Sequence, residues 1–357
     1  MTGALVTGDL VFAVPGDLSI PTGGYAYDRR MIAELAALGW RTEVLDLGDG
    51  FPRPSASTRT AAEAQLAAVP EGRPIVIDGL AFGVLPRLAA RLRATHPLVA
   101  LIHHPLALET GLAAHEAADM RQSERSALAS AHAVVANSVT TARTLSADYD
   151  VSPDRITVVP PGTDRPVIAA REKSRKGPVA LLAIGAVVPR KGYDALIAAL
   201  AELSGLPWRL TIAGDCARDP DTAARLEADI IRFKLEQRVA IEGAVAADRL
   251  ASLYAAADLF VLPSRYEGFG MAFAEAIAHG LPVIGTTGGA IPDTVPPSAG
   301  VLVPPDDRAA LVAALRRLIE RPEERARFAA GARAAADRLP TWRASAALFS
   351  AAIERVT

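Results

Sequence analysis

Short apolar runs alternate with longer segments of helical period along most of the chain. Runs of aliphatic and β-branched residues predict strands, whereas Ala- and Leu-rich segments with apolar positions three or four residues apart predict helices. Regular alternation of the two is typical of a doubly wound α/β fold with parallel sheets. The expected strands of the first half are 10–14, 42–47, 74–78, 99–102, 133–136 and 156–159, and the expected helices are 25–38, 58–68, 84–94, 120–129 and 138–149.

A polar, charged stretch with flanking prolines, 163–176, interrupts this alternation, and its composition is typical of an interdomain linker. Beyond it we expect strands at 179–184, 209–213, 239–242, 259–262, 282–285 and 300–303, and helices at 193–201, 221–235, 247–256, 271–279, 307–320, 322–338 and 341–356.

The length of 357 residues exceeds what one hydrophobic core usually supports, so two domains are expected. We place an N-terminal Rossmann-like domain at 1–165, a linker at 166–176 and a C-terminal Rossmann-like domain at 177–338. The final helix, 339–357, is expected to pack back on the N-terminal domain.

Composition and charge narrow the class of protein. A formal net charge of -2 argues against a nucleic-acid partner, because binding a phosphate backbone draws on a basic surface. Cys216 is the only cysteine, which excludes an intramolecular disulfide and fits a reducing cytoplasm. We therefore expect a cytoplasmic protein. No apolar stretch reaches the roughly 18 residues of a membrane span, so we expect it to be soluble, or at most peripheral to a membrane. The arginines of the basic segment 86–96 are better explained as solvated side chains than as a contact with anionic membrane.

The segment 263–280, PSRYEGFGMAFAEAIAHG, carries the most specific chemistry. After an apolar run the chain turns through Gly268 and Gly270, and a helical pattern begins at Met271. Free N–H groups and the positive dipole end at a helix start suit a phosphate, and glycines let an anion approach the main chain. Glu267 and Glu275 flank this turn, but their spacing alone fits surface carboxylates equally well.

The longer segment 264–295, SRYEGFGMAFAEAIAHGLPVIGTTGGAIPDTV, resembles the signature of family-four retaining glycosyltransferases, glycosyl transferases group 1. Two glutamates separated by seven residues mark that signature. The resemblance implies that Glu275 binds the ribose hydroxyls of a nucleotide-sugar and that Glu267 contacts hydroxyls of its sugar. It further implies that the main chain of the turn binds phosphate and sugar, through Gly268, Phe269, Gly270, Met271, Ala272 and Phe273.

Three other segments are similar to the same family in order and separation. In IGAVVPRKG, 184–192, Gly185 follows a strand, and Arg190 and Lys191 resemble the basic pair that clamps the diphosphate. In TIAGD, 211–215, Gly214 would let a strand end lie close to the nucleotide, although an ordinary turn explains it equally well. In PTGGYAY, 21–27, Gly23 and Gly24 resemble a Gly-Gly turn that approaches the phosphates from the other domain.

Two histidines, His103 and His104, follow the apolar run 98–102. A position at the carboxyl end of a strand directs a side chain toward the ligand edge of a parallel sheet. His103 is the match to a family histidine that contacts the donor sugar near the reaction centre. Glu109 is expected to be a solvated carboxylate, and Ser138 is expected to cap a helix.

The resemblance implies a GT-B fold, in which two Rossmann-like doubly wound domains face a central cleft. The implied reaction moves a sugar from a UDP- or GDP-linked donor to an acceptor hydroxyl with retention of anomeric configuration. The acceptor class is a saccharide, a lipid-linked molecule or a small-molecule hydroxyl. No Asp-x-Asp pair lies at a strand end, so no metal and no other cofactor is expected; Arg190, Lys191 and the helix-terminal amides would offset the leaving-group charge.

Other activities on similar folds remain as alternatives. A GT-B-fold phosphorylase and a sugar-nucleotide epimerase are the nearest, and a non-catalytic nucleotide-sugar-binding module is a third. A nicotinamide oxidoreductase is disfavoured, because no G-x-G-x-x-G motif with a following acid is present.

Overall fold

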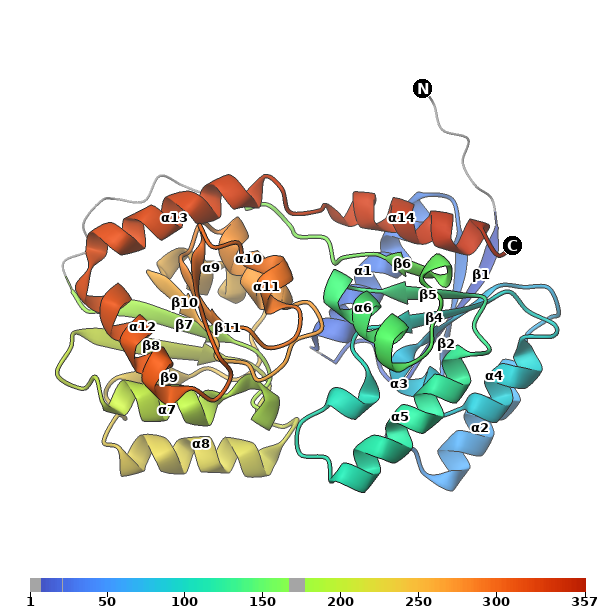
Figure 1. Ribbon diagram of the computed structural model, residues 1–357, viewed down its shortest axis with the longest axis horizontal. Helices are drawn as coiled ribbons and strands as arrows, with labels where there is room; N and C mark the ends of the chain where they lie inside the picture. Colours follow the sequence, from blue (N-terminus) through green and yellow to red (C-terminus); the bar gives the residue numbers. More distant parts are fainter. Residues whose placement is uncertain (1–7, 21, 167–176) are drawn as a thin grey trace. The chain divides into compact units, whose positions relative to one another are not determined.

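The computed structural model describes residues 8–20, 22–166 and 177–357, which form two compact units (Figure 1). Unit 1 comprises Met1–Gly162 and Pro340–Thr357, and unit 2 comprises Thr163–Leu339. All but the first residue of the linker expected at 166–176 lies outside the described residues. The chain therefore passes from unit 1 into unit 2 after Gly162 and returns at Pro340.

Unit 1 is built on a six-stranded parallel sheet in the order β2-β1-β3-β4-β5-β6. Its strands are β1 (Asp9–Val14), β2 (Arg41–Asp46), β3 (Ile75–Asp78), β4 (Leu98–Ile102), β5 (Ala133–Ala136) and β6 (Ile156–Val158). The sheet winds outward in both directions from the boundary between β1 and β3. In sheets of this type, ligands bind beyond the carboxyl ends of the strands at such a boundary.

The helices of unit 1 begin at side-chain caps in several places. They are α1 (Gly23–Ala37), α2 (Ala56–Ala67), α3 (Gly79–Phe82), α4 (Pro86–Leu92), α5 (Ala114–Leu128), α6 (Val139–Asp148) and α14 (Trp342–Glu354), with 3-10 turns η1 (Leu106–Leu108) and η2 (Pro153–Arg155). The hydroxyl of Ser138 accepts a hydrogen bond from the Thr141 N–H, which confirms Ser138 as the cap of α6. Helix α5 begins six residues before the expected start, because its first turns are polar and exposed and lack an apolar stripe.

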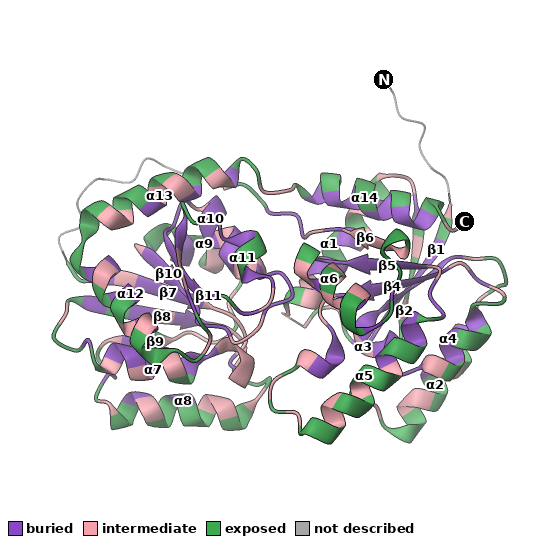
Figure 2. Ribbon diagram, in the orientation of Figure 1, coloured by how far each residue is buried: buried purple, intermediate pink, exposed green. Residues whose placement is uncertain are grey.

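Helix α14 completes the core of unit 1 although it comes last in the chain. Its Phe349 ring stacks on Phe12 of β1 at 6.2 Å between centroids, and Trp342 contacts the edge of Tyr27 of α1 at 5.9 Å. The Trp40 indole N–H donates to the Ser350 hydroxyl at 2.8 Å. Figure 2 shows the buried residues of α14 on the side of the helix that faces the sheet.

Unit 2 has a second six-stranded parallel sheet, in the order β12-β11-β10-β7-β8-β9. Its strands are β7 (Val179–Ile184), β8 (Trp208–Ala213), β9 (Val239–Ile241), β10 (Leu259–Val261), β11 (Val283–Thr286) and β12 (Gly300–Val303). Around them lie η3 (Pro189–Lys191), α7 (Tyr193–Ala201), α8 (Pro220–Arg232), α9 (Ala247–Ala256), α10 (Met271–Ala278), α11 (Ile291–Thr294), α12 (Arg308–Glu320) and α13 (Pro322–Ala336). The winding reverses between β7 and β10, which is the ligand edge of this sheet.

The expected doubly wound α/β class is confirmed in both units. Every strand that the sequence predicts is present, with ends that agree within one residue. The short helices α3 and α11 were not predicted, because four residues cannot display a helical period. Within the described part of the chain, no helix combines the length and apolarity that crossing a membrane requires.

Candidate active site

The ligand edge of unit 2 gathers three segments that follow neighbouring strands. Arg190 and Lys191 come after β7, Ser264 and Glu267 come after β10, and a Gly-Gly turn comes after β11. Because all of these strands are parallel, their carboxyl ends lie at one edge of the sheet. Arg190, Lys191 and Glu267, expected to share a site, are therefore brought into direct contact.

The Glu267 carboxylate is the centre of this cluster. Its Oε1 accepts hydrogen bonds from Lys191 Nζ and Ser264 Oγ, each at 2.6 Å, and its Oε2 lies 3.0 Å from Arg190 Nη1. The side chain is only 8% exposed. Burial by itself would raise the pKa of Glu267, but the two cations and the Ser264 hydroxyl lower it to about 2. Glu267 is consequently ionised at neutral pH, and the three charged groups sum to one positive charge.

The backbone around Glu267 is held by the turn that follows β11. The Ala290 N–H donates to the Glu267 carbonyl oxygen at 2.8 Å. Gly289 has φ of 60°, and a Cβ there would lie 2.2 Å from the same oxygen, so only glycine fits. The Thr286 hydroxyl donates to the Ser264 carbonyl oxygen, which ties β11 to the same segment. This turn fixes the position of the glutamate.

Helix α10 starts directly after the cluster, with Gly270 in a left-handed conformation at φ 90°. The first N–H groups of the helix, at Met271 and Ala272, have no intrahelical acceptor because of their position. The Phe273 side chain is fully buried and contacts Phe260 of β10, so only its backbone is available to a ligand. The start of α10 thus offers N–H groups and the positive end of the helix dipole.

Glu275 lies about one turn further along α10, and its side chain is held by a residue of α9. The Tyr254 hydroxyl donates to Glu275 Oε2 at 2.7 Å, and the Tyr254 ring stacks on His279 with centroids 4.7 Å apart. Burial raises the pKa of the Glu275 carboxyl. The contact fixes one carboxylate oxygen and orients the group.

Gly185 and Gly214 lie at the carboxyl ends of β7 and β8, where the two strand ends meet. A Cβ on Gly214 would lie 1.8 Å from the Gly185 carbonyl oxygen, and one on Gly185 would lie 3.0 Å from Lys191 Cε. The close approach of these two backbones requires a glycine at Gly214, whether or not a nucleotide also lies there. Gly268 is buried in the turn before α10.

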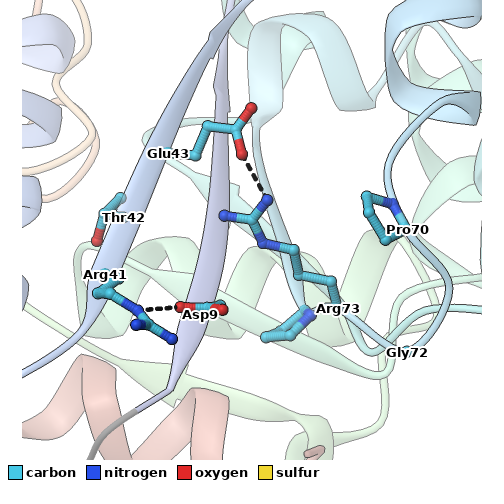
Figure 3. Close-up of a pocket in the computed structure, with 8 residues that line it drawn as sticks. Asp9, Arg41, Thr42, Glu43, Pro70, Gly72 and Arg73 are labelled. Carbon is cyan, nitrogen blue, oxygen red and sulfur yellow. Dashed lines mark hydrogen bonds and ion pairs between the residues drawn. The ribbon is translucent and has the colours of Figure 1, made fainter.

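In unit 1, the two edges of the sheet differ in chemistry. An open groove lies at the amino edge of the sheet, next to the first residues of β1 and β2 and the segment that leads into β3 (Figure 3). Two ion pairs, Arg41 with Asp9 and Arg73 with Glu43, occupy it. Ligands of parallel sheets bind at the opposite edge, so this groove is not the candidate site.

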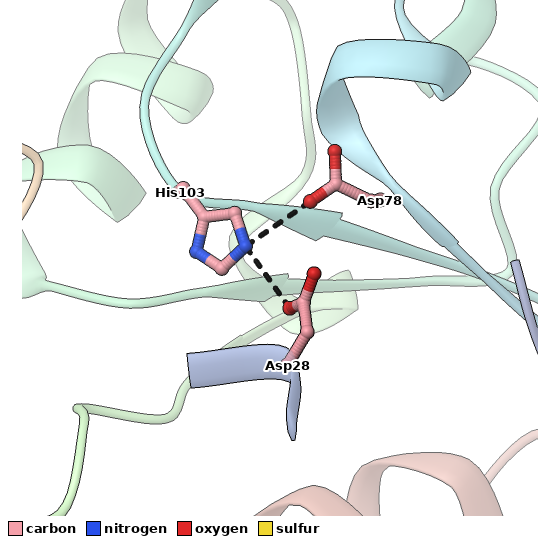
Figure 4. Close-up of side chains that lie close together, drawn as sticks. All are labelled: Asp28, Asp78 and His103. Atoms are coloured by element: carbon pink, nitrogen blue, oxygen red, sulfur yellow. Dashed lines mark hydrogen bonds and ion pairs between the residues drawn. The ribbon is translucent and has the colours of Figure 1, made fainter. Parts of the chain in front are cut away.

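The carboxyl edge of unit 1 holds His103 between two buried aspartates (Figure 4). His103 Nε2 lies 3.2 Å from Asp28 Oδ1 of α1 and 3.2 Å from Asp78 Oδ2 at the end of β3. The Asp28 and Asp78 side chains are 0% and 1% exposed, and that of His103 is 15% exposed. Burial lowers the pKa of His103, yet the two carboxylates raise it to about 10, which makes it an imidazolium at neutral pH.

The Gly-Gly turn expected to approach phosphate forms the start of α1. The Thr22 hydroxyl accepts from the Tyr25 N–H, and Gly23 and Gly24 make up the first residues of the helix. A Cβ on Gly24 would lie 3.4 Å from His103 Cδ2, so the turn packs against the histidine. Pro21 lies outside the described residues. His104, by contrast, pairs with the half-exposed Glu109 at 3.3 Å.

Four residues of these sites were missed at the level of sequence: Asp28, Asp78, Tyr254 and Ser264. A signal for Asp28 was available, because it shares the buried face of α1 with Tyr27, Met31 and Leu35 at helical spacing. Asp78 ends an apolar run, IVID, at the ligand edge of the sheet. A charged residue in such a position is a candidate for function.

Comparison with known proteins bears on the family and the fold of the chain. Residues 164–335 match the family model described as glycosyl transferases group 1, and residues 47–165 match that of glycosyltransferase family 4. The chain is 35% identical over 242 residues to a D-inositol 3-phosphate glycosyltransferase of Xylanimonas cellulosilytica, a match over 63% of this chain and 58% of that protein. It therefore spans less than two thirds of that relative.

Two solved structures share the fold over nearly the full length. A sucrose-phosphate synthase from Thermosynechococcus elongatus has a TM-score of 0.82 at 23% identity, covering 98% of this chain and 99% of its own. Anabaena HepE in complex with UDP has a TM-score of 0.73 at 21% identity, covering 98% and 100%. With two Rossmann-like units and these family matches, the chain belongs to the group 1, family 4 glycosyltransferases of GT-B fold.

Proposed function

We propose that the protein transfers a glycosyl group from a nucleoside-diphosphate sugar to an acceptor hydroxyl, with retention of anomeric configuration. The observation that carries the proposal is the Glu267 carboxylate paired with Arg190 and Lys191 beside the start of α10. The three charges leave one net positive charge, next to free helix N–H groups. A diphosphate is the chemical group that such an arrangement stabilises best.

Each residue has a distinct part in the proposed reaction. Glu275, oriented by Tyr254, binds the ribose hydroxyls, and Glu267 accepts hydrogen bonds from hydroxyls of the sugar. As the bond between the anomeric carbon and the diphosphate oxygen breaks, Arg190, Lys191 and the α10 N–H groups offset the charge on the leaving diphosphate. The acceptor oxygen bonds to the same face of the sugar, and its proton passes to the departing phosphate oxygen.

We further propose that this chemistry needs no metal. Two cationic side chains and a helix start supply the charge that a divalent cation supplies in other transferases. Turnover is expected to stay within about twofold of the untreated enzyme after dialysis against a chelator. Readdition of Mg²⁺ or Mn²⁺ is likewise expected to change it by no more than about twofold. A loss of more than tenfold that Mn²⁺ restores would contradict metal independence.

The nucleotide and the acceptor are the open parts of the proposal. The UDP complex of HepE supports a uridine nucleotide, and GDP is the other candidate. The Xylanimonas relative is a D-inositol 3-phosphate glycosyltransferase, which supports a small hydroxylated acceptor that carries phosphate. Saccharide and lipid-linked acceptors are the other candidate classes. The single Cys216 supports a reducing compartment, and we propose the cytoplasm.

A panel of UDP-, GDP- and ADP-sugars tests the site, with thermal shift and slow hydrolysis of the sugar donor as measurements. One nucleotide should stabilise the wild type, and Glu275→Ala should abolish that stabilisation. Glu236→Ala, an exposed glutamate in unit 2, is the control that should retain it. If no nucleotide stabilises the wild type, the assignment of the donor site is wrong.

Product analysis tests the reaction class. Transfer or hydrolysis releases a free nucleoside diphosphate, and the anomeric proton of the product, followed by NMR, reports retention or inversion. A phosphorylase would consume inorganic phosphate and form a sugar 1-phosphate, and an epimerase would release no nucleotide. Either product pattern would replace the transferase proposal.

A further inference from the structure

The buried cluster of Asp28, Asp78 and His103 joins three elements of unit 1. Asp28 comes from α1, Asp78 from the end of β3 and His103 from the end of β4, around the point where the sheet reverses its winding. Asp78 Oδ1 already accepts from the Leu80 N–H at 2.7 Å as the cap of α3. Its other oxygen, Oδ2, and Asp28 Oδ1 are the atoms within 3.2 Å of His103 Nε2.

The charges around the histidine are unbalanced without a proton on the ring. Two fully buried carboxylates require a positive partner, because an unpaired buried charge is costly. The charged groups that act on His103 are Asp28 from α1 and Asp78 from β3. Tyr27, whose ring contacts His103 edge-on at 5.2 Å, stays neutral because burial raises its pKa, and its hydroxyl donates to the Val159 carbonyl oxygen. Among the described groups at this site, the imidazolium is the cation that faces the aspartates. It offsets one of the two carboxylates, and burial raises the pKa of the Asp28 carboxyl to about 7.

The orientation of the ring is fixed by the same contacts. Nε2 faces the two carboxylates, and Figure 4 shows the second nitrogen, Nδ1, on the side of the ring away from them. Gly24 and Tyr27 pack against the ring from α1, and turning the ring over would move Nε2 away from both carboxylates and lose both ion pairs. A doubly protonated ring held in this way presents an N–H at Nδ1.

We propose that Asp28 and Asp78 are positioning residues that hold His103 as an imidazolium and present its Nδ1–H as a hydrogen-bond donor to an oxygen of the sugar substrate. The part played toward the sugar rests on the proposed glycosyl transfer, whereas the charge state of His103 does not. The cluster as a whole then carries charge of both signs in one place: a cationic donor on the substrate side and carboxylates behind it.

NMR of the full-length protein with ¹⁵N-labelled histidine tests the charge state directly. The His103 signals, assigned by their loss in His103→Gln, should show a doubly protonated ring from pH 6 to pH 8.5. Asp28→Asn and Asp78→Asn both keep the size of the side chain, and Asp78→Asn also keeps an oxygen that can cap α3. Each variant should lower the pKa of His103 by at least one unit. Glu109→Gln removes the comparable partner of His104 and should leave the His103 signals unchanged.

A neutral His103 ring in the folded wild type at pH 7 would overturn the proposal. So would unchanged titration of His103 in both Asn variants, each shown to be folded by its thermal transition. Because the three side chains have ligand atoms within 4.8 Å of one another, Zn²⁺ is added in a parallel sample. Stoichiometric Zn²⁺ binding that displaces the ring protons would assign the cluster to a cation instead.

Kinetics separate positioning from a merely structural effect. In Asp28→Asn, kcat for the sugar donor should fall about 10- to 100-fold with KM changed less than threefold, and the loss should deepen as pH rises from 6 to 9. A packing defect would lower activity equally at every pH. If no nucleotide-sugar is processed by any form, the proposed function fails, while the NMR titration still decides the charge state of His103.

Discussion

At the scale of single residues, the Glu267 carboxylate pairs with two cationic side chains in a largely buried site. Replacement by Gln keeps the shape but leaves Arg190 and Lys191 facing an amide inside a largely buried site. Breaking a buried ion pair is costly, so we expect Glu267→Gln to lose roughly 1–3 kcal/mol of stability, measured by urea unfolding at pH 7. Hydrolysis of the sugar donor should fall at least tenfold. Glu236→Gln is the exposed control, and equal stability of the two variants would contradict the ion-pair argument.

The same residue predicts an acid dependence. The pKa of Glu267 is about 2 in the folded protein, below its ordinary value of 4.5. Its contribution to the unfolding free energy is thus fully present above pH 4.5 and is lost as the pH falls toward 2. Unfolding measured between pH 5 and 3 should show a steeper loss of stability for the wild type than for Glu267→Gln. Parallel curves for the two proteins would contradict the lowered pKa.

A site residue could be predicted from the sequence only where it lies in a local motif. Glu267, Glu275, Arg190 and Lys191 lie in motifs, so the resemblance of those motifs to a family predicted one site for all four. The structure brings Arg190, Lys191 and Glu267 into contact. Asp28 has no motif, and its partner His103 is 75 positions away along the chain. The pairing of these two appears only when α1 and β4 meet at the same sheet edge, and no local pattern encodes it.

At the scale of elements, α9 supports the carboxylate of α10 through one hydroxyl. Tyr254→Phe removes the 2.7 Å hydrogen bond to Glu275 but keeps the ring stacked on His279. A hydrogen bond of this kind contributes about 1 kcal/mol, so KM for the nucleotide-sugar should rise roughly fivefold with kcat nearly unchanged. Ser252→Ala, on the same helix, is the control. A fall in kcat without a change in KM would show that Tyr254 acts on the reaction itself.

A buried carboxyl on α5 predicts a dependence of stability on alkaline pH. Glu124 Oε2 accepts from the Leu106 N–H at 2.9 Å and so anchors η1, and burial raises the pKa of Glu124 to about 8. Stability is greatest below pH 4.5, where Glu124 is protonated in both states, and falls as the pH rises through 8. Relative to Glu124→Gln, which keeps an acceptor for Leu106, the wild type should lose on the order of 1–3 kcal/mol between pH 5 and 9. Denaturant unfolding at both pH values measures this, and a constant difference would contradict it.

The elements themselves were predicted more completely than the contacts between them. Most strand positions followed from apolar runs, because the central strands are buried on both faces and have little polar content. The edge strand β2, RTEVLD, is largely exposed and is an exception. Helix starts were less reliable, and α5 shows why: its first turns, AHEAAD, bury nothing and leave no stripe to detect. The 3-10 turn η3, which carries Arg190 and Lys191, has no periodic signal at all.

At the scale of the whole molecule, α14 links the end of the chain to the core of unit 1. Phe349 is fully buried against Phe12, while its neighbour Leu348 is 47% exposed. We expect Phe349→Ala to lower the stability of unit 1 by about 3–5 kcal/mol, and Leu348→Ala by less than about 0.5 kcal/mol. Thermal unfolding of the two variants provides the measurement. Similar transitions for both would mean that α14 does not complete that core.

The sequence indicated two α/β domains from length and from the break in alternation near residue 163. It also showed the number and order of strands along the chain, but not their order in space. Strand order depends on how each crossover helix packs, and this differs between β2-β1-β3 in unit 1 and β10-β7-β8 in unit 2. Both windings nevertheless place their reversal next to the residues singled out for chemistry.

The return of the chain to unit 1 has a consequence for biosynthesis. A ribosome makes Met1–Gly162 first and Trp342–Glu354 only after all of unit 2 has been translated. At ordinary elongation rates this delay lasts roughly 10 to 40 s. Throughout it, the surface of the nascent N-terminal unit that α14 will cover, around Phe12 and Tyr27, remains open to water and to chaperones. The unit that begins synthesis first is therefore the one that finishes folding last.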